Sequence, residues 1–369
     1  MLTYVSSYLI SMFLFKKKIY KYLYIFFFII VFIINEFSTN QALSKNYIIK
    51  EVKIEEIYDL NFDKLKVIDK AFFKAFNILI YKILEKKDHS RLKNISLKQI
   101  KTLVDNFSII DERFINDKYQ SQFEVQFNRK KIIRFMENKS IISSLPKEIS
   151  SFILPILIDT KNNELYYLNQ NVFFKNWNKI SKKHFLINYV LIDQDIEDYE
   201  IIKKKMKNLE NYDFNEITRK YNLKNQIILI VLKSENKLRV FSKIKFDKKY
   251  ILINKIYNNV DIYKEESVNK MILDLKENYE DKWKSINKLN TSIILPIRLK
   301  VDSKKIEKSE KLEKILLNLD LVSNFKIEKI DSKEIFYKII FNSTPQKFLE
   351  EMLLFDFKID SSSSIWELK

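Results

Sequence analysis

The sequence predicts an α+β fold made of two or three small modules, each with an antiparallel sheet and helices packed on one face. Two observations lead to this prediction. Segments in which apolar and polar residues alternate recur along the chain, and segments with an apolar helical stripe lie between them. The part of the chain after residue 44 is also longer than one domain usually is.

Residues 1–44 indicate a membrane-targeting segment. Positive charges from Lys16 to Lys21 precede an uncharged run, Tyr22 to Asn35. That run is shorter than the roughly 20 residues of a membrane span and closer to the core of a signal peptide. Small residues from Ala42 to Ser44 suit a leader peptidase, so we expect cleavage after Ser44 and a periplasmic protein.

An uncleaved anchor in the inner membrane is the alternative. The residues before Met12 are also uncharged and largely apolar, which fits poorly in front of an ordinary leader. Either translation starts at Met12 instead of Met1, or this segment holds the protein on the membrane.

The composition excludes several classes of protein. The chain has no cysteine, so it forms no disulfide and has no thiolate nucleophile or cysteine-ligated zinc. It also has no glycine, which removes the glycine-dependent phosphate loops of Walker A and dinucleotide-binding proteins. We therefore expect no nucleotide cofactor.

The formal net charge of +18 suggests an anionic partner. Lysine is nevertheless interspersed with glutamate and aspartate, and Lys, Asn, Ile, Phe and Tyr dominate throughout, as in a genome biased toward A and T. We expect no nucleic-acid partner. A functional basic surface would instead suit anionic lipid headgroups or envelope polymers.

The first module, residues 45–160, contains the clearest strand. From Tyr119 to Phe127, aromatic and apolar residues alternate with Gln and Glu, which predicts one buried and one wet face. The predicted elements are a strand at 47–58, helices at 64–86 and 97–104, strands at 107–114 and 119–127, a helix at 129–137 and a strand at 152–158.

The middle module, residues 161–291, repeats part of this order. The pattern predicts a strand at 185–192, helices at 197–206 and 214–221, strands at 226–232, 237–244 and 250–257, and a long polar exit helix at 263–286.

The last module, residues 292–369, has the element order of a split βαβ, or ferredoxin-like, module. Thr344 and Pro345 suit the N-cap and first position of a helix. Phe336 and Tyr337 could stack on RNA bases, but core packing is the better interpretation. The predicted elements are a strand at 292–301, a helix at 305–319, strands at 322–330 and 335–342, a helix at 345–354 and two terminal strands through Trp366.

No catalytic, cofactor-binding or metal-binding residue is predicted. His89 and His184 are far apart in sequence, and we expect each to face solvent instead of sharing a zinc ion. Asp111, Glu112 and Arg113 are interpreted as a surface salt bridge. The cluster Asp193, Asp195, Glu197, Asp198 and Glu200 lies where a strand gives way to a helix, where carboxylates cap amides more often than they bind cations.

Lys203, Lys204, Lys205 and Lys207 form a basic turn on the polar side of a predicted helix. A solvated helix face is the preferred interpretation, and contact with lipid or polymer is the alternative.

The order of these features resembles an uncharacterised proteobacterial envelope family catalogued as domain of unknown function 2066. The resemblance implies an exported protein with no assigned reaction. The chain departs from the family pattern at Ser343, where glycine is usual, and at Val172, where proline is usual. The similar features are the leader, Val52, the helix at 71–84, the strand at 107–113, the strand at 119–127, Leu154 with Pro155, Asn171, Trp177, Asp193, Asp198 and the tail at 366–368.

Three functions remain open from the sequence. The leading hypothesis is a non-enzymatic envelope protein that binds other proteins or envelope components through exposed sheet edges or helix faces. The second is an enzyme acting on an envelope polymer through Asp111, Glu112 or the acidic cluster at 193–200. The third is a basic protein that binds the membrane surface.

Overall fold

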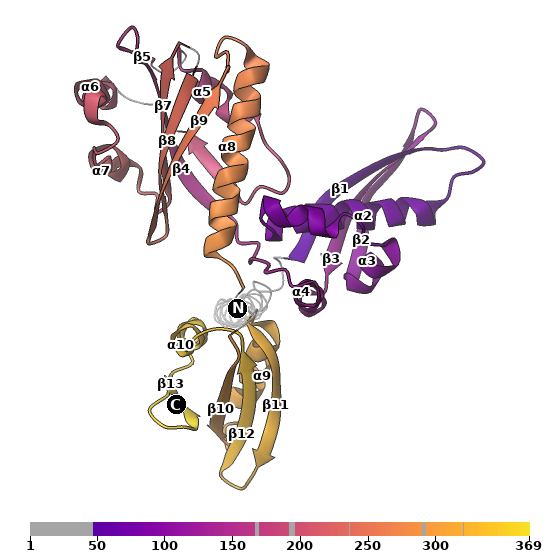
Figure 1. The fold of residues 1–369 in the computed structure, drawn as a ribbon. Coiled ribbons are helices and arrows are strands. Elements are labelled where there is room, and N and C mark those ends of the chain that lie inside the picture. The colour runs from indigo at the N-terminus through magenta and orange to yellow at the C-terminus, as the bar shows by residue number, and fades with distance from the viewer. Residues whose placement is uncertain (1–46, 167–169, 192–195, 236, 290–292, 320) are drawn as a thin grey trace, which may run out of the picture.

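The computed structural model describes residues 47–166, 170–191, 196–235, 237–289, 293–319 and 321–369. Three sheets with separate hydrophobic cores confirm the predicted α+β fold in several modules (Figure 1). The predicted leader and its cleavage site lie outside the described residues. Within these ranges no helix is long and apolar enough to cross a membrane.

The first module is a three-stranded antiparallel sheet in the order β1-β3-β2. The predicted alternation in β3 is confirmed, since Tyr119, Phe123 and Val125 are buried against α2. Helix α2 begins at the N-cap Asp63, and α3 begins with a capping box at Ser96. The elements are β1 (Ile48–Ile57), α2 (Lys64–Ile83), η2 (Lys86–Leu92), α3 (Leu97–Leu103), β2 (Val104–Ile115), β3 (Lys118–Phe127) and α4 (Arg129–Asn138).

Strand β4 (Ile149–Asp159) lies in the middle sheet, which corrects the predicted boundary at residue 160. It pairs in parallel with β6 (Ile187–Leu191) and β7 (Gln226–Ser234), and antiparallel with β5 (Glu164–Tyr166). The physical reason lies in its sequence. Its nearly continuous apolar run buries both faces, as is usual for a central strand with parallel neighbours.

The middle sheet continues from β7 through the antiparallel strands β8 (Lys237–Phe246) and β9 (Lys249–Asn258). Strand β9 is an edge strand. The prediction of helices on one face is wrong for this module, because both faces are covered (Figure 1). One face packs on α5 (Val172–Asn176) and α8 (Glu265–Ile286), and the other on α6 (Ile196–Lys205) and α7 (Asn215–Thr218).

Two residues of the family resemblance have structural roles in this module. Asn171 caps α5 by accepting bonds from the amides of Phe173 and Phe174, and its side chain donates to the Pro155 carbonyl at 2.9 Å. The Trp177 side chain is fully buried and stacks on Tyr279. Both residues therefore hold α5 and α8 against the sheet.

The C-terminal sheet has the order β11-β12-β10-β14-β13. The predicted helix start is confirmed, since Thr344 accepts a bond from the Lys347 amide. Tyr337 is buried in the core, as the core interpretation requires. The elements are β10 (Leu295–Asp302), α9 (Ile306–Asn318), β11 (Val322–Ile330), β12 (Glu334–Phe341), α10 (Pro345–Leu353), β13 (Ile359–Asp360) and β14 (Trp366–Leu368).

The end of this module departs from the split βαβ order. The last strand, β14, lies between β10 and β13 and runs parallel to β10. In a split βαβ module the strand after the second helix would pair with the first strand directly. Here the chain turns after β13, where Asp360 accepts bonds from Ser362, and inserts the final residues instead.

Several turns adopt left-handed backbone conformations without glycine. Asn116 and Asp117 both have positive φ and join β2 to β3 through a two-residue turn. Asparagine and aspartate tolerate this region better than other residues with a side chain. Within the described ranges the residues with positive φ are Glu51, Asn116, Asp117, Ser140, Asn163, Asn222, Asp247, Asn259 and Asp356.

Candidate functional site

The predicted acid and base residues are held in local pairs. Arg113 lies 3.0 Å from a carboxylate oxygen of Asp111 on the exposed strand β2. Glu112 accepts bonds from the Lys64 ammonium at 2.7 Å and the Tyr119 hydroxyl at 2.8 Å. The hydrogen bond from Lys64 has the largest effect on the pKa of the Glu112 carboxyl and lowers it, and the bond from Tyr119 lowers it further. The arrangement agrees with the salt-bridge interpretation.

The acidic cluster is divided in a similar way. Asp193 and Asp195 lie outside the described residues. Asp198 is fully buried in the first turn of α6, where its carboxylate accepts bonds from the Lys220 ammonium at 2.9 Å and the Tyr221 hydroxyl at 3.1 Å. The exposed lysines 203–205 occupy the last turn of the same helix. Their positive charges interact favourably with the negative end of the helix dipole there.

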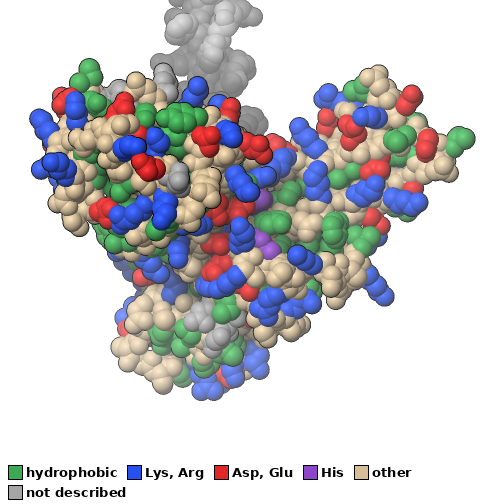
Figure 2. Space-filling view, turned by 45° about the horizontal axis from the view of Figure 1, so that its top comes forward, with side chains coloured by type: hydrophobic (Ala, Val, Ile, Leu, Met, Phe, Trp, Pro, Cys, Tyr) green, Lys and Arg blue, Asp and Glu red, His purple; other side chains and the backbone are tan. Residues whose placement is uncertain are grey.

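The structure corrects the prediction for the two histidines. His89 and His184 both contact the ring of Tyr81, with centroid distances of 4.3 and 4.7 Å. Figure 2 shows the histidine side chains in the crease between two lobes of the molecule, beside a group of carboxylates. Tyr81 of α2 contacts both rings, an arrangement that the distance between the histidines in the sequence could not indicate.

The surroundings of the histidines favour their neutral forms. Burial, followed by the positive charges of Lys284, His89, Lys182 and Lys82, lowers the pKa of His184 to about 4. Burial also lowers the pKa of His89, whose ring lies 3.1 Å from the Leu84 carbonyl oxygen. In the described part of the chain, no three His, Asp or Glu side chains are grouped as a metal site would require.

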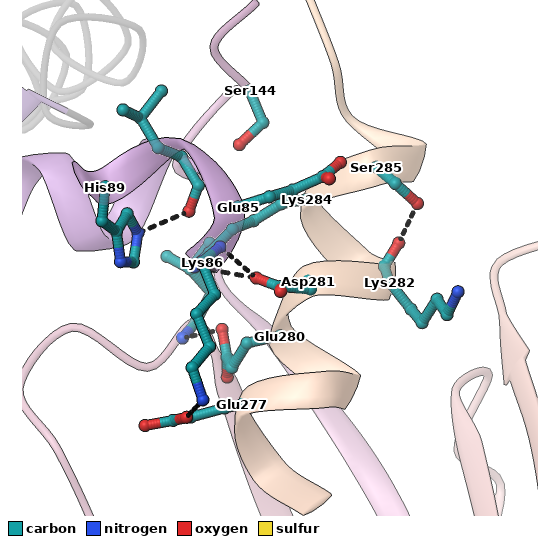
Figure 3. Close-up of polar contacts among 12 residues, drawn as sticks. Glu85, Lys86, His89, Ser144, Glu277, Glu280, Asp281, Lys282, Lys284 and Ser285 are labelled. Atoms are coloured by element: carbon teal, nitrogen blue, oxygen red, sulfur yellow. Dashed lines mark hydrogen bonds and ion pairs between the residues drawn. The ribbon is translucent and has the colours of Figure 1, made fainter. Parts of the chain in front are cut away.

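Ionic contacts join η2 to α8 beside the histidines (Figure 3). The Lys86 amide donates to Asp281 at 3.1 Å, and its ammonium donates to Glu277 at 2.7 Å. Glu85 contacts Lys288 at 2.7 Å. The first and middle modules therefore meet through charged groups as well as rings.

Helix α8 carries three charged residues on its buried side. Lys276, Glu280 and Lys284 follow one another at four-residue steps, and none exposes more than 4% of its surface. The Glu280 carboxylate accepts bonds from the amides of Leu186 and Ile187, both at 2.9 Å. Sequence reasoning described this helix as polar and missed the stripe. The sequence did carry a signal for the stripe, because these three charged positions lie beside the apolar positions 272, 279 and 283 on one side of the helix.

Burial dominates the electrostatics of the stripe. It lowers the pKa of Lys276 to about 8 and lowers the pKa of Lys284. It raises the pKa of Glu280, against the effect of the two amide donors and Lys284. Each group thus depends on its few polar neighbours to remain charged.

The outer face of β8 and β9 exposes apolar and basic side chains together. On β9, Tyr250, Leu252 and Ile256 are 76%, 65% and 59% exposed. Their cross-strand neighbours on β8 are Lys245, Lys243 and Arg239. We call this set of six residues the β9 surface.

A groove of about 520 Å³ runs beside the β9 surface. Tyr212 and Phe214 form one side of it, and Lys243 and Leu252 form the other. The Lys243 ammonium donates to the Tyr212 carbonyl at 2.7 Å, and burial lowers its pKa. The groove therefore offers an apolar wall next to a cation.

No family model matches the chain. The chromosomal replication initiator protein DnaA of Buchnera aphidicola subsp. Cinara cedri (strain Cc) is 27% identical over an aligned stretch of 183 residues. The match covers 38% of this chain and 40% of that protein, so the chain spans less than half the length of this relative. This similarity shows no family for the chain, and the resemblance to the envelope family stays a prediction.

Proposed function

We propose that this protein is an exported, non-enzymatic envelope protein that binds an extended segment of a partner protein along β9. Export is supported by the positive block from Lys16 to Lys21, the apolar run after it and the small residues before Lys45. Protease protection in intact cells and N-terminal sequencing of the mature product test export. A product that keeps its full mass and is protected from protease in the way that cytoplasmic proteins are would contradict export.

The observation that carries the binding proposal is the exposed edge strand β9. A long edge strand presents unpaired backbone groups, and natural proteins usually shorten, charge or cover such edges. Here ten residues form the strand, and its outer face exposes Tyr250, Leu252 and Ile256. Addition of a strand from a partner would bond the edge and cover these side chains.

The charges beside β9 favour an acidic partner segment. Lys243, Lys245 and Lys249 form no ion pair with any carboxylate in the described ranges. A segment in which apolar residues alternate with Asp or Glu would place apolar side chains in the groove and carboxylates near these lysines.

We expect Leu252→Lys to weaken binding of such a segment at least about tenfold, because it removes the apolar wall and adds a charge. Peptides selected from a displayed library should alternate apolar and acidic residues, and fluorescence anisotropy measures their affinity for each variant. Leu317→Lys, a change at an exposed leucine of α9, is the matched control and should bind normally.

Hydrogen exchange distinguishes the outcomes. Bound peptide should slow exchange of amides in β9, whereas protection confined to the edge strands β2 or β11 would contradict the proposal. Sedimentation of the protein with anionic vesicles, reduced by salt, would instead support the membrane-surface alternative. For the enzyme alternative, the structure shows Asp111, Glu112 and Asp198 in three separate ion pairs and not side by side.

A further inference from the structure

A second cavity, of about 420 Å³, lies between α8 and the segment leading into β6. We call it the Lys276 cavity. Most of the side chains that line it are polar, and most of these can donate hydrogen bonds. Its donors are Asn178, Ser181, Lys182, Asn188, Tyr189 and Lys276.

The Lys276 ammonium is buried without a carboxylate partner. The residue is 2% exposed, and its Nζ donates to the Ile180 carbonyl oxygen at 2.6 Å. Within the described ranges no carboxylate oxygen lies within ion-pair distance of it. Glu280, one turn further along α8, has its oxygens on the amides of Leu186 and Ile187. An ammonium has three donors, so Lys276 retains capacity for a ligand.

The rings around Lys276 fix its position. Its Nζ lies 4.6 Å from the centroid of the Tyr189 ring and 5.4 Å from that of Trp177. Such contacts stabilise a cation on an aromatic face but satisfy none of its hydrogen-bond donors. The ammonium is thus held in place beside the cavity and not drawn out toward water.

Two further buried donors lack partners. In the described structure the Tyr189 hydroxyl, on a residue only 6% exposed, has no hydrogen-bond partner, and neither has the indole N–H of Trp177. Buried polar groups of proteins are nearly always paired, so unpaired ones point to a missing partner. Of these two groups Tyr189 lines the Lys276 cavity, and the one carboxylate in the described lining, Glu148, is paired with Lys82 at 2.8 Å.

We propose that the Lys276 cavity binds the carboxylate of a small organic monoanion, with Lys276 and Tyr189 as the donors. A carboxylate accepts several hydrogen bonds and supplies the counter-charge that the buried ammonium lacks. One buried cation balances one negative charge, and a dianion such as phosphate would bring an uncompensated charge into the cavity. This inference is independent of the β9 surface.

Benzoate binding to the full chain tests the proposal, with benzyl alcohol as the neutral control and inorganic phosphate as the dianion. We expect saturable binding of benzoate by calorimetry and a higher Lys276 pKa in its presence, measured by NMR of the lysine side chains. Lys276→Met should weaken binding at least about tenfold, and Tyr189→Phe about fivefold. Lys175→Met, at an exposed lysine of α5, should have no effect.

Circular dichroism and tryptophan fluorescence check that each variant is folded. Should Lys276→Met not fold, Tyr189→Phe and the NMR titration of the natural chain still decide the question. Equal benzoate affinity in the natural chain and Tyr189→Phe, absence of saturable binding, or tighter binding of phosphate than of benzoate would each overturn the proposal.

Discussion

Replacing Glu280 with alanine is expected to reduce the free energy of unfolding by about 3–5 kcal/mol, the usual effect of removing one partner from a buried charged network. The change leaves the amides of Leu186 and Ile187 without an acceptor at the start of β6. It also removes the negative charge that lies between Lys276 and Lys284 on the buried side of α8. Unpaired buried donors and cations together make this effect large.

Denaturant unfolding followed by tryptophan fluorescence measures the effect. Two of the three tryptophans, Trp177 and Trp283, lie in the core of the middle module, so the signal reports mainly on that module. Glu277→Ala is the matched control, because Glu277 is on the same helix but pairs with Lys86 at the surface. A surface pair is worth less than about 1 kcal/mol. Equal losses in both variants would contradict the importance of the Glu280 network.

The second large effect is a loss of stability in mild acid caused by the half-buried histidines. The ordinary pKa of histidine is 6.5, and that of His184 in the folded protein is about 4. Between these values the unfolded chain binds more protons than the folded chain. The contribution of His184 is therefore fully present above pH 6.5 and is lost as the pH falls toward 4. His89 acts in the same direction.

The magnitude follows from the shift. At about 1.4 kcal/mol per pKa unit the full shift would correspond to roughly 3 kcal/mol, and partial exposure of the ring reduces our expectation to about 2 kcal/mol. Burial raises the pKa values of Glu280 and Asp281, and raised carboxyl pKa values oppose this trend as the pH falls. A comparison of variants is therefore needed to isolate the histidine.

His184→Phe provides that comparison, because phenylalanine can keep the stacking on Tyr81 and does not titrate. We expect the variant to gain stability relative to the natural chain as the pH falls from 7 to 4.5, measured as the difference in unfolding free energy at each pH. Parallel pH profiles of the two proteins would show that His184 does not titrate as proposed.

Local patterns were sufficient to predict most elements of the fold. The alternation from Tyr119 to Phe127 and the cap at Thr344 depend on neighbours in sequence, and both are found as expected. The assignment of β4 was wrong because its run of apolar residues is compatible with any sheet, and only pairing with β6 and β7 decides which one. Similarly, the final strand pair follows a turn that sequence order does not specify.

The candidate sites were harder to predict because they depend on long-range packing. His89 and His184 meet on Tyr81 only after two modules are assembled. Charged residues of α8 look like an exposed face in sequence, yet Lys276 and Glu280 are buried by the segment leading into β6. The β9 surface was foreseen only as a general class, an exposed sheet edge, because periodicity gives no information on which strand ends a sheet.

The turns built without glycine have a consequence for stability. Asn116, Asp117 and Asn222 occupy left-handed positions that glycine would adopt without steric cost. Asparagine and aspartate tolerate this region better than other residues with a side chain. Glycine at any of these positions would remove the steric cost of the turn, but it would also give the unfolded chain more conformational freedom to lose on folding.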